Sequence, residues 1–156
     1  MNRRGSDHPQ YCPGSAGTSP AAPTEDAMSR QPLQTGKSWE TKVPFSLGVA
    51  ASGRFLHTAG ITARADDGSV IGPNDMRAQV ARCFENLGEV LQAAGAGWGD
   101  VVKYTIFTTD IERYDQDTRD IRLPFFVDRP AATLVEVRRL VHPEMLVEIE
   151  AVVCLR

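Results

Sequence analysis

Short runs of alternating or wholly apolar residues predict five β-strands along the chain. The stretches at residues 43–50 and 54–60 are separated by three small residues and are expected to pair as a hairpin. Residues 101–109 are rich in β-branched and aromatic side chains, which favour an extended strand. Two further runs, at residues 132–139 and 145–155, close the chain, and the last alternates apolar with acidic residues before it becomes wholly apolar.

Two segments between these strands follow the three-and-four spacing of an amphipathic helix. The first starts after Asn74 or Asp75, either of which can cap it, and stops at Gly95. Its apolar positions are Met76, Val80, Cys83, Phe84, Leu87, Val90, Leu91 and Ala94. The second, at residues 111–126, is weaker, and Pro124 is expected to kink or end it because proline has no backbone N–H to donate.

Together these elements predict an α+β fold of two layers, in which two helices pack on one face of a mixed sheet. The other face of such a sheet still carries apolar side chains. A domain of this size has no further element to cover that face, so we expect copies of the chain to bury it in a homo-oligomer.

The first forty residues differ in composition from the rest of the chain. They contain five Pro, four Gly and five Ser, and Leu33 is their only Leu, Ile, Val or Phe. Such a segment cannot bury enough apolar surface to offset the entropy lost when it becomes ordered. We therefore expect a disordered tail at residues 1–38 before a folded domain at residues 39–156, with residues 1–27 dispensable and Met28 an alternative start.

Charge and cysteine content exclude several functional classes for this chain of 156 residues. The formal net charge is -3 and neither sign gathers into a long run, so nucleic acid is not an expected partner. No signal peptide and no run of about 20 apolar residues is present, so we expect a cytoplasmic protein with no membrane partner. Cys12, Cys83 and Cys154 form no CxxC pair, and no phosphate-binding glycine loop or metal triad is found, so no cofactor or metal is implied.

Six short blocks of residues are recognisable when they are taken together. They are Pro44-Phe45-Ser46, Thr58-Ala59-Gly60, Glu85-Asn86-Leu87, Asp100-Val101-Val102-Lys103, Pro130-Ala131-Ala132-Thr133 and Val147-Glu148-Ile149-Glu150-Ala151. In order and spacing they resemble the Rid (YjgF) family of enamine and imine deaminases, from about Trp39 onward. The resemblance implies a chorismate-mutase-like fold, a homotrimer, and a small-molecule substrate bound in a cleft between neighbouring subunits.

The resemblance also implies which residues form that cleft. In the deaminases an arginine directly after Pro-Ala forms a bidentate salt bridge to the substrate carboxylate, and a glutamate, here Glu148, helps to position the attacking water. Ala132 stands at the arginine position, so the usual carboxylate anchor is missing. Gly60 and Thr133 are candidates for backbone contacts with a ligand.

Other cleft positions depart from the family pattern. Phe45 stands where tyrosine is usual, Leu134 where cysteine is common, and Arg119 and Arg122 where Asn and Tyr are usual. Two interpretations of the arginines stay open. They are solvated or paired with one of Asp115, Asp117 and Asp120 on the same helix, or one of them is a relocated anion anchor.

Glu148 also has two interpretations. On an alternating strand it points to solvent together with Glu150, whereas the family resemblance places it in the cleft among apolar groups such as Phe45 and Leu134. A carboxylate in apolar surroundings suits proton transfer, so we expect Glu148 to be a general acid or base.

These features predict a cofactor-free acid/base enzyme that acts on an imine, enamine or enol-like metabolite by hydrolysis, water addition or elimination, or tautomerisation. The missing anchor favours a biosynthetic intermediate over 2-aminoacrylate. The alternatives are a deaminase of the 2-iminobutanoate/2-iminopropanoate or 2-aminomuconate type, and a non-catalytic trimer that binds a small molecule or acts like a chaperone. RNA cleavage, a further class, is disfavoured by the net charge.

Overall fold

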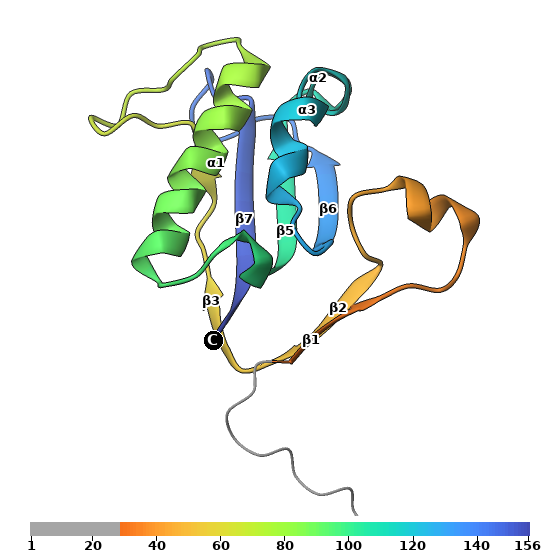
Figure 1. Ribbon diagram of the computed structural model, residues 1–156. Helices are drawn as coiled ribbons and strands as arrows, with labels where there is room; N and C mark the ends of the chain where they lie inside the picture. The colour runs from red at the N-terminus through yellow and green to blue at the C-terminus, as the bar shows by residue number, and fades with distance from the viewer. Residues whose placement is uncertain (1–28) are drawn as a thin grey trace, which may run out of the picture.

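The computed structural model describes residues 29–156, which form one large sheet, one small sheet and a layer of helices (Figure 1). The strands are β1 (Ser29–Leu33), β2 (Gly48–Ser52), β3 (Arg54–His57), β4 (Ile61–Thr62), β5 (Val101–Thr108), β6 (Ala131–Glu136) and β7 (Val147–Leu155). The α-helices are α1 (Met76–Ala93), α2 (Ile111–Asp117) and α3 (Arg119–Arg122), with 3-10 turns at Ser38–Lys42, Trp98–Asp100 and Leu123–Phe125.

The large sheet has the strand order β3-β7-β5-β6, and β4 also pairs with β7. Only the β5–β6 pair is parallel, so the sheet is mixed. Figure 1 shows α1, α2 and α3 on one face of this sheet. The predicted two-layer α+β fold is therefore confirmed. No helix within residues 29–156 is long and apolar enough to cross a membrane.

Helix α1 follows the predicted amphipathic pattern. The Asp75 side chain caps it by accepting a hydrogen bond from the Ala78 N–H at 3.0 Å. Gly95 follows the helix with a φ of +69°, a conformation that suits glycine because it lacks a Cβ. The buried apolar face packs on β4 and β7, and through Phe84 on Tyr104 of β5. It consists of Met76, Val80, Cys83, Phe84, Leu87 and Leu91.

An aromatic cluster centred on Phe84 joins α1 to the rest of the core. The Phe84 ring stacks on Phe125 with centroids 4.3 Å apart, and it meets Trp98 and Tyr104 edge-on at 6.0 and 6.1 Å. The Tyr104 hydroxyl donates to the Phe125 carbonyl at 2.9 Å. Because Tyr104 lies on β5 and Phe125 follows α3, the cluster ties both helical segments to the sheet.

The predicted hairpin between residues 43–50 and 54–60 is wrong. Strand β2 pairs with β1, whereas β3 pairs with β7. Gly53 is the only residue between β2 and β3, and a tight hairpin normally needs two loop residues. With a φ of +136°, Gly53 instead turns the chain from the small sheet into the large one.

The second predicted helix, at residues 111–126, is divided into α2, α3 and a 3-10 turn. It breaks at Thr118, whose hydroxyl donates to the Tyr114 carbonyl and thereby provides a local alternative to helical continuation. Pro124 lies in the 3-10 turn just after α3, which agrees with the expected helix end. The two closing strands are shorter than expected. Strand β6 already ends at Glu136, and β7 begins only at Val147.

Part of the expected tail at residues 1–38 is structured. Residues 29–33 form β1 along the whole of β2, and the next residues are held by Glu40, which is 3% exposed. The Glu40 carboxylate accepts hydrogen bonds from the N–H groups of residues 35, 36 and 37 and from the Thr35 hydroxyl. Satisfied backbone donors thus order a segment that has almost no apolar residues. Residues 1–28 lie outside the described part of the chain.

Replacing Phe84 with alanine is expected to lower the free energy of unfolding by about 3–5 kcal/mol, because it removes the centre of the aromatic cluster and leaves a cavity. Urea unfolding at one fixed protein concentration measures this change. Val141→Ala, at a side chain that is 80% exposed, is the control and should change stability by less than about 0.5 kcal/mol. A loss for Phe84→Ala as small as that of the control would contradict the central position of this ring.

The Glu40 contacts predict a pH dependence of stability. The Thr35 hydroxyl, and then the neighbouring backbone N–H groups, hold the pKa of the Glu40 carboxyl below its usual range. A carboxyl whose pKa is lowered by folding stabilises the protein above its unfolded pKa, and this stabilisation is lost as the pH falls through the folded value. Between about pH 6 and pH 3, the melting temperature should therefore fall more for the unmodified protein than for Glu40→Gln. Equal falls would show that the carboxylate contributes nothing.

Candidate functional site

A cavity of about 320 Å³ lies between the segment before β2, the β6 edge and the helices α2 and α3. It brings together five of the eight predicted site residues, which are Phe45, Arg119, Arg122, Ala132 and Leu134. Its wall also includes Ile106, Tyr114 and Phe126, which make the cavity partly apolar.

Strand pairing fixes the β6 wall of this cavity. Ala132 lies beside Tyr104 and Leu134 beside Ile106, and both partners are buried side chains that face the helices. Ala132 and Leu134 therefore point to the helix-covered face of the sheet. Ser46 pairs with the start of β6, and its N–H donates to the Pro130 carbonyl at 3.1 Å, which brings the preceding Phe45 to the same place.

Arg122 is held by its own helical segment. Its guanidinium donates to Asp115 at 2.5 Å and to the Tyr114 carbonyl at 2.7 Å, and it lies 4.7 Å from the centre of the Tyr114 ring. The side chain is 9% exposed. For Arg122 the interpretation as a partner of Asp115 therefore describes the structure, and its donors are used in holding α2 against α3.

Arg119, three residues earlier, lines the same cavity as Arg122 but is not held by neighbouring groups in this way. It is exposed, it lines the cavity, and it has no hydrogen bond or ion pair within residues 29–156. Its neighbour Asp120 is paired with Arg77 through two contacts of 2.8 Å, which lower the pKa of the Asp120 carboxyl to about 2. The charge of Arg119 is thus available to a molecule in the cavity.

Glu148 and Thr133 lie on the other face of the sheet. Glu148 is paired with Phe107. The adjacent pair, Ile106 with Ile149, is buried under the helices. Because side chains alternate along a strand, Glu148 faces away from the helix layer, as does Thr133, which receives a hydrogen bond from Lys103. The expected setting of Glu148 among Phe45 and Leu134 is therefore not found within one copy of the chain.

Gly60 lies directly against Glu148. A Cβ atom at Gly60 would be 2.6 Å from Cδ of Glu148 and closer still to its carboxylate oxygen. Thr58 fixes this approach, because its N–H and its hydroxyl both bond to the backbone of Ala151 on β7. The Glu148 carboxylate occupies the space left by the glycine and has no hydrogen bond or ion pair within residues 29–156.

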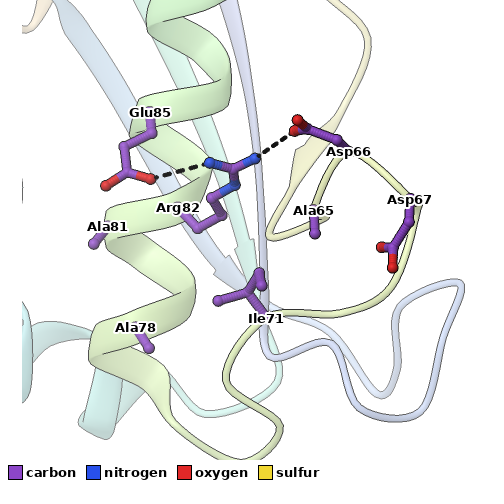
Figure 2. A pocket seen from close by; sticks show the side chains of 8 residues that line it. All are labelled: Ala65, Asp66, Asp67, Ile71, Ala78, Ala81, Arg82 and Glu85. Carbon is purple, nitrogen blue, oxygen red and sulfur yellow. Dashed lines mark hydrogen bonds and ion pairs between the residues drawn. The ribbon is translucent and has the colours of Figure 1, made fainter.

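A wider hollow of about 630 Å³ lies between α1 and the loop before it, and the one cation that lines it within residues 29–156, Arg82, is already paired. Figure 2 shows Arg82 between Asp66 and Glu85, at 3.2 and 3.4 Å. Its Nε donates to the Arg64 carbonyl at 3.0 Å. Arg82 therefore braces the loop against the helix, and the hollow offers no free cation to a ligand.

Two buried groups near the site remain protonated. Burial, assisted by the charge of Glu148, raises the pKa of the Cys83 thiol, which suits an inert core residue better than a nucleophile. Burial also raises the pKa of Tyr114 to about 12. Within residues 29–156 no group of three or more His, Cys, Asp or Glu residues is placed to hold a metal ion.

Sequence reasoning did not select Tyr114 as a site residue, although a signal was present. Tyr114, Thr118 and Arg122 are spaced four apart, which places them on one face of a helical segment. The structure shows all three in contact, with Tyr114 and Arg122 on the cavity wall. Lys42, which also lines the cavity, lies in a segment without regular periodicity and gave no signal.

Comparisons with known proteins show which family this chain resembles. The family model described as Endoribonuclease L-PSP matches residues 35–155. The RutC family protein slr0709 of Synechocystis sp. is 35% identical over 131 residues, which cover 82% of this chain and 98% of that protein. The 2-iminobutanoate/2-iminopropanoate deaminase of Escherichia coli K12 is 30% identical over 113 residues, 70% of this chain and 85% of that protein.

Solved structures show the same fold. YyfB from Yersinia pestis, described as a member of the conserved Rid protein family, matches with a TM-score of 0.73 and 33% identity, over 82% of this chain and 100% of its own. The YjgF gene product of E. coli matches with a TM-score of 0.57 and 28% identity, over 80% of this chain and 93% of its own. Family model, relatives and structures together show that the chain belongs to the Rid (YjgF) family.

Proposed function

We propose that the protein is a cofactor-free acid/base enzyme acting on an imine, enamine or enol-like small metabolite, with Glu148 as the proton-transferring group. The observation that carries the proposal is the Glu148 carboxylate, which lies over Gly60 without a partner in residues 29–156. A carboxylate serving only the fold would be expected to accept hydrogen bonds, as Glu40 does.

The complete site requires a second copy of the chain. Glu148 and Gly60 lie on the sheet face away from the helices, whereas Phe45, Ala132 and Leu134 line the cavity on the helix side. One copy cannot bring both groups to one small molecule, but the uncovered sheet face of one copy can meet the cavity edge of the next. This supports a homo-oligomer with its substrate in the cleft between neighbouring subunits, and we propose the trimer that the family resemblance implies.

In the proposed reaction, water adds across the C=N bond of the substrate. The water oxygen bonds to the imine carbon, and Glu148 carries one water proton to the nitrogen. The carbinolamine then loses ammonia as its hydroxyl proton moves through Glu148 to the nitrogen and the C–N bond breaks, which leaves a carbonyl. No electron acceptor or metal enters this sequence of steps.

Ala132 supports a substrate other than 2-aminoacrylate. An alanine side chain supplies no donor for a carboxylate attached next to the imine carbon, and it leaves the cavity beside β6 open. We therefore favour a larger metabolite, such as a biosynthetic intermediate. Deamination of 2-iminobutanoate or 2-iminopropanoate is the second candidate, because the E. coli deaminase is 30% identical to this chain.

Glu148→Gln is expected to reduce imine hydrolysis at least 100-fold, because glutamine cannot accept the proton from water. The measurement is ammonia released from imines that an amino-acid oxidase generates in situ. Gly60→Ala should give a similar loss by displacing the Glu148 carboxylate, while thermal melting shows that the fold survives. Turnover unchanged by either substitution would overturn the proposal, and a protein that turns over no imine or enol would be a non-catalytic binder.

Ala132→Arg is expected to raise turnover of 2-iminobutanoate by about tenfold or more, since a bidentate carboxylate contact stabilises by about 1.5–3 kcal/mol. The same oxidase-coupled assay measures the change, with Ala93→Arg, at an exposed position of α1 outside the cavity, as the matched control. If the unmodified protein already hydrolyses 2-iminobutanoate and Ala132→Arg adds nothing, the second candidate function replaces the first.

A further inference from the structure

The two arginines of the segment before β6 have separate tasks, and the difference concerns the substrate. The Arg122 guanidinium donates hydrogen bonds to Asp115 and to the Tyr114 carbonyl. Arg119 lines the same cavity with its guanidinium unpaired within residues 29–156. A planar guanidinium with five N–H donors is suited to hold a carboxylate through two parallel hydrogen bonds.

The surroundings of Arg119 favour an anion in this cavity. Lys42 adds a second positive charge to the wall, and the lining carboxylate, Asp115, is already paired with Arg122. The Tyr114 hydroxyl on the same wall is buried and has no hydrogen-bond partner within the described residues. Such an unsatisfied buried donor costs stability unless an acceptor is supplied.

We propose that Arg119 replaces the arginine missing at position 132 and binds a carboxylate of the substrate at the α3 wall of the cavity. This inference rests on the proposed function and defines its substrate class. Arg119 lies on α3, whereas position 132 lies on β6. A carboxylate bound by Arg119 therefore lies at a different place in the cavity from one bound by an arginine at position 132. The space left by Ala132 accommodates the additional atoms between the two places. The substrate class is therefore an imine or enamine with a carboxylate distant from the reacting carbon.

Binding of two keto acids tests this assignment without requiring turnover. The probes are 2-oxoglutarate, which has a second carboxylate remote from the keto carbon, and 2-oxobutanoate, which has none. Titration calorimetry should show that Arg119→Gln raises the dissociation constant of 2-oxoglutarate about 30-fold, as expected for loss of a charge-assisted bidentate contact. The dissociation constant of 2-oxobutanoate should change by less than about threefold. Arg119→Lys should be intermediate, because it keeps the charge and loses the planar donor pair.

Arg54→Gln is the matched control, since it removes the same charge from an exposed residue on β3, at the opposite edge of the sheet from β6. It should leave both affinities unchanged. Equal 2-oxoglutarate affinities for the Arg119→Gln variant, the Arg54→Gln variant and the unmodified protein would overturn the assignment. Melting curves identify a variant that fails to fold, and Arg119→Lys then provides the comparison.

Turnover of 2-iminoglutarate, generated in situ from glutamate, separates this inference from the proposed function. Hydrolysis that requires Glu148 but is unaffected by Arg119→Gln would support the proposed enzyme function and contradict the carboxylate-binding role of Arg119. Arg119-dependent binding of 2-oxoglutarate without any Glu148-dependent turnover would support the carboxylate-binding role of Arg119 and contradict the proposed enzyme function. Loss of both binding and turnover in Arg119→Gln, with the fold intact, is the result expected when both are correct.

Discussion

The alternation of side chains along β5, β6 and β7 is the constraint on which the site depends. One row of paired residues, Leu134, Ile106 and Ile149, lies under the helices. The next row, Val135, Phe107 and Glu148, lies on the opposite face of the sheet. The helix face is filled by the aromatic cluster around Phe84, so this alternation cannot shift by one residue without exposing the core. The Glu148 carboxylate and the cavity beside β6 lie on opposite faces of the sheet as a consequence.

Much of the fold could be read from the chain because its periods are strong. Helix α1 was predicted with its buried face and with Asn74 or Asp75 as its cap, of which Asp75 is the one observed, and β5 was predicted within one residue of its observed end. The pairing of β2 could not be predicted, because its partner β1 contains none of the β-branched or aromatic residues that usually signal a strand. Hydrogen bonds to a buried carboxylate, which leave no hydrophobic pattern, order the loop that follows β1.

The site was predictable as a set of residues and not as an arrangement. The blocks of sequence suggested Phe45, Ala132, Leu134 and Glu148, but periodicity within one strand does not show which of its side chains point to the helix-covered face of the sheet. Within the described residues Arg122 is paired and Arg119 is not, and the Arg122 contacts with Thr118 and Asp115 lie around the break at Thr118. Local side-chain hydrogen bonds of this kind compete with the regular helix and are weakly encoded in hydrophobic spacing.

Arg129 links the two walls of the cavity mechanically. Its guanidinium donates to the carbonyls of Glu40 and Phe45 at 2.5 and 3.1 Å, and it immediately precedes the Pro130 that begins the β6 wall. Displacement of the Phe45 segment is therefore transmitted to the edge strand, and the width of the cavity is set jointly by both. Substitutions on the two walls should be energetically non-additive, so a change on one wall is expected to require a matching change on the other.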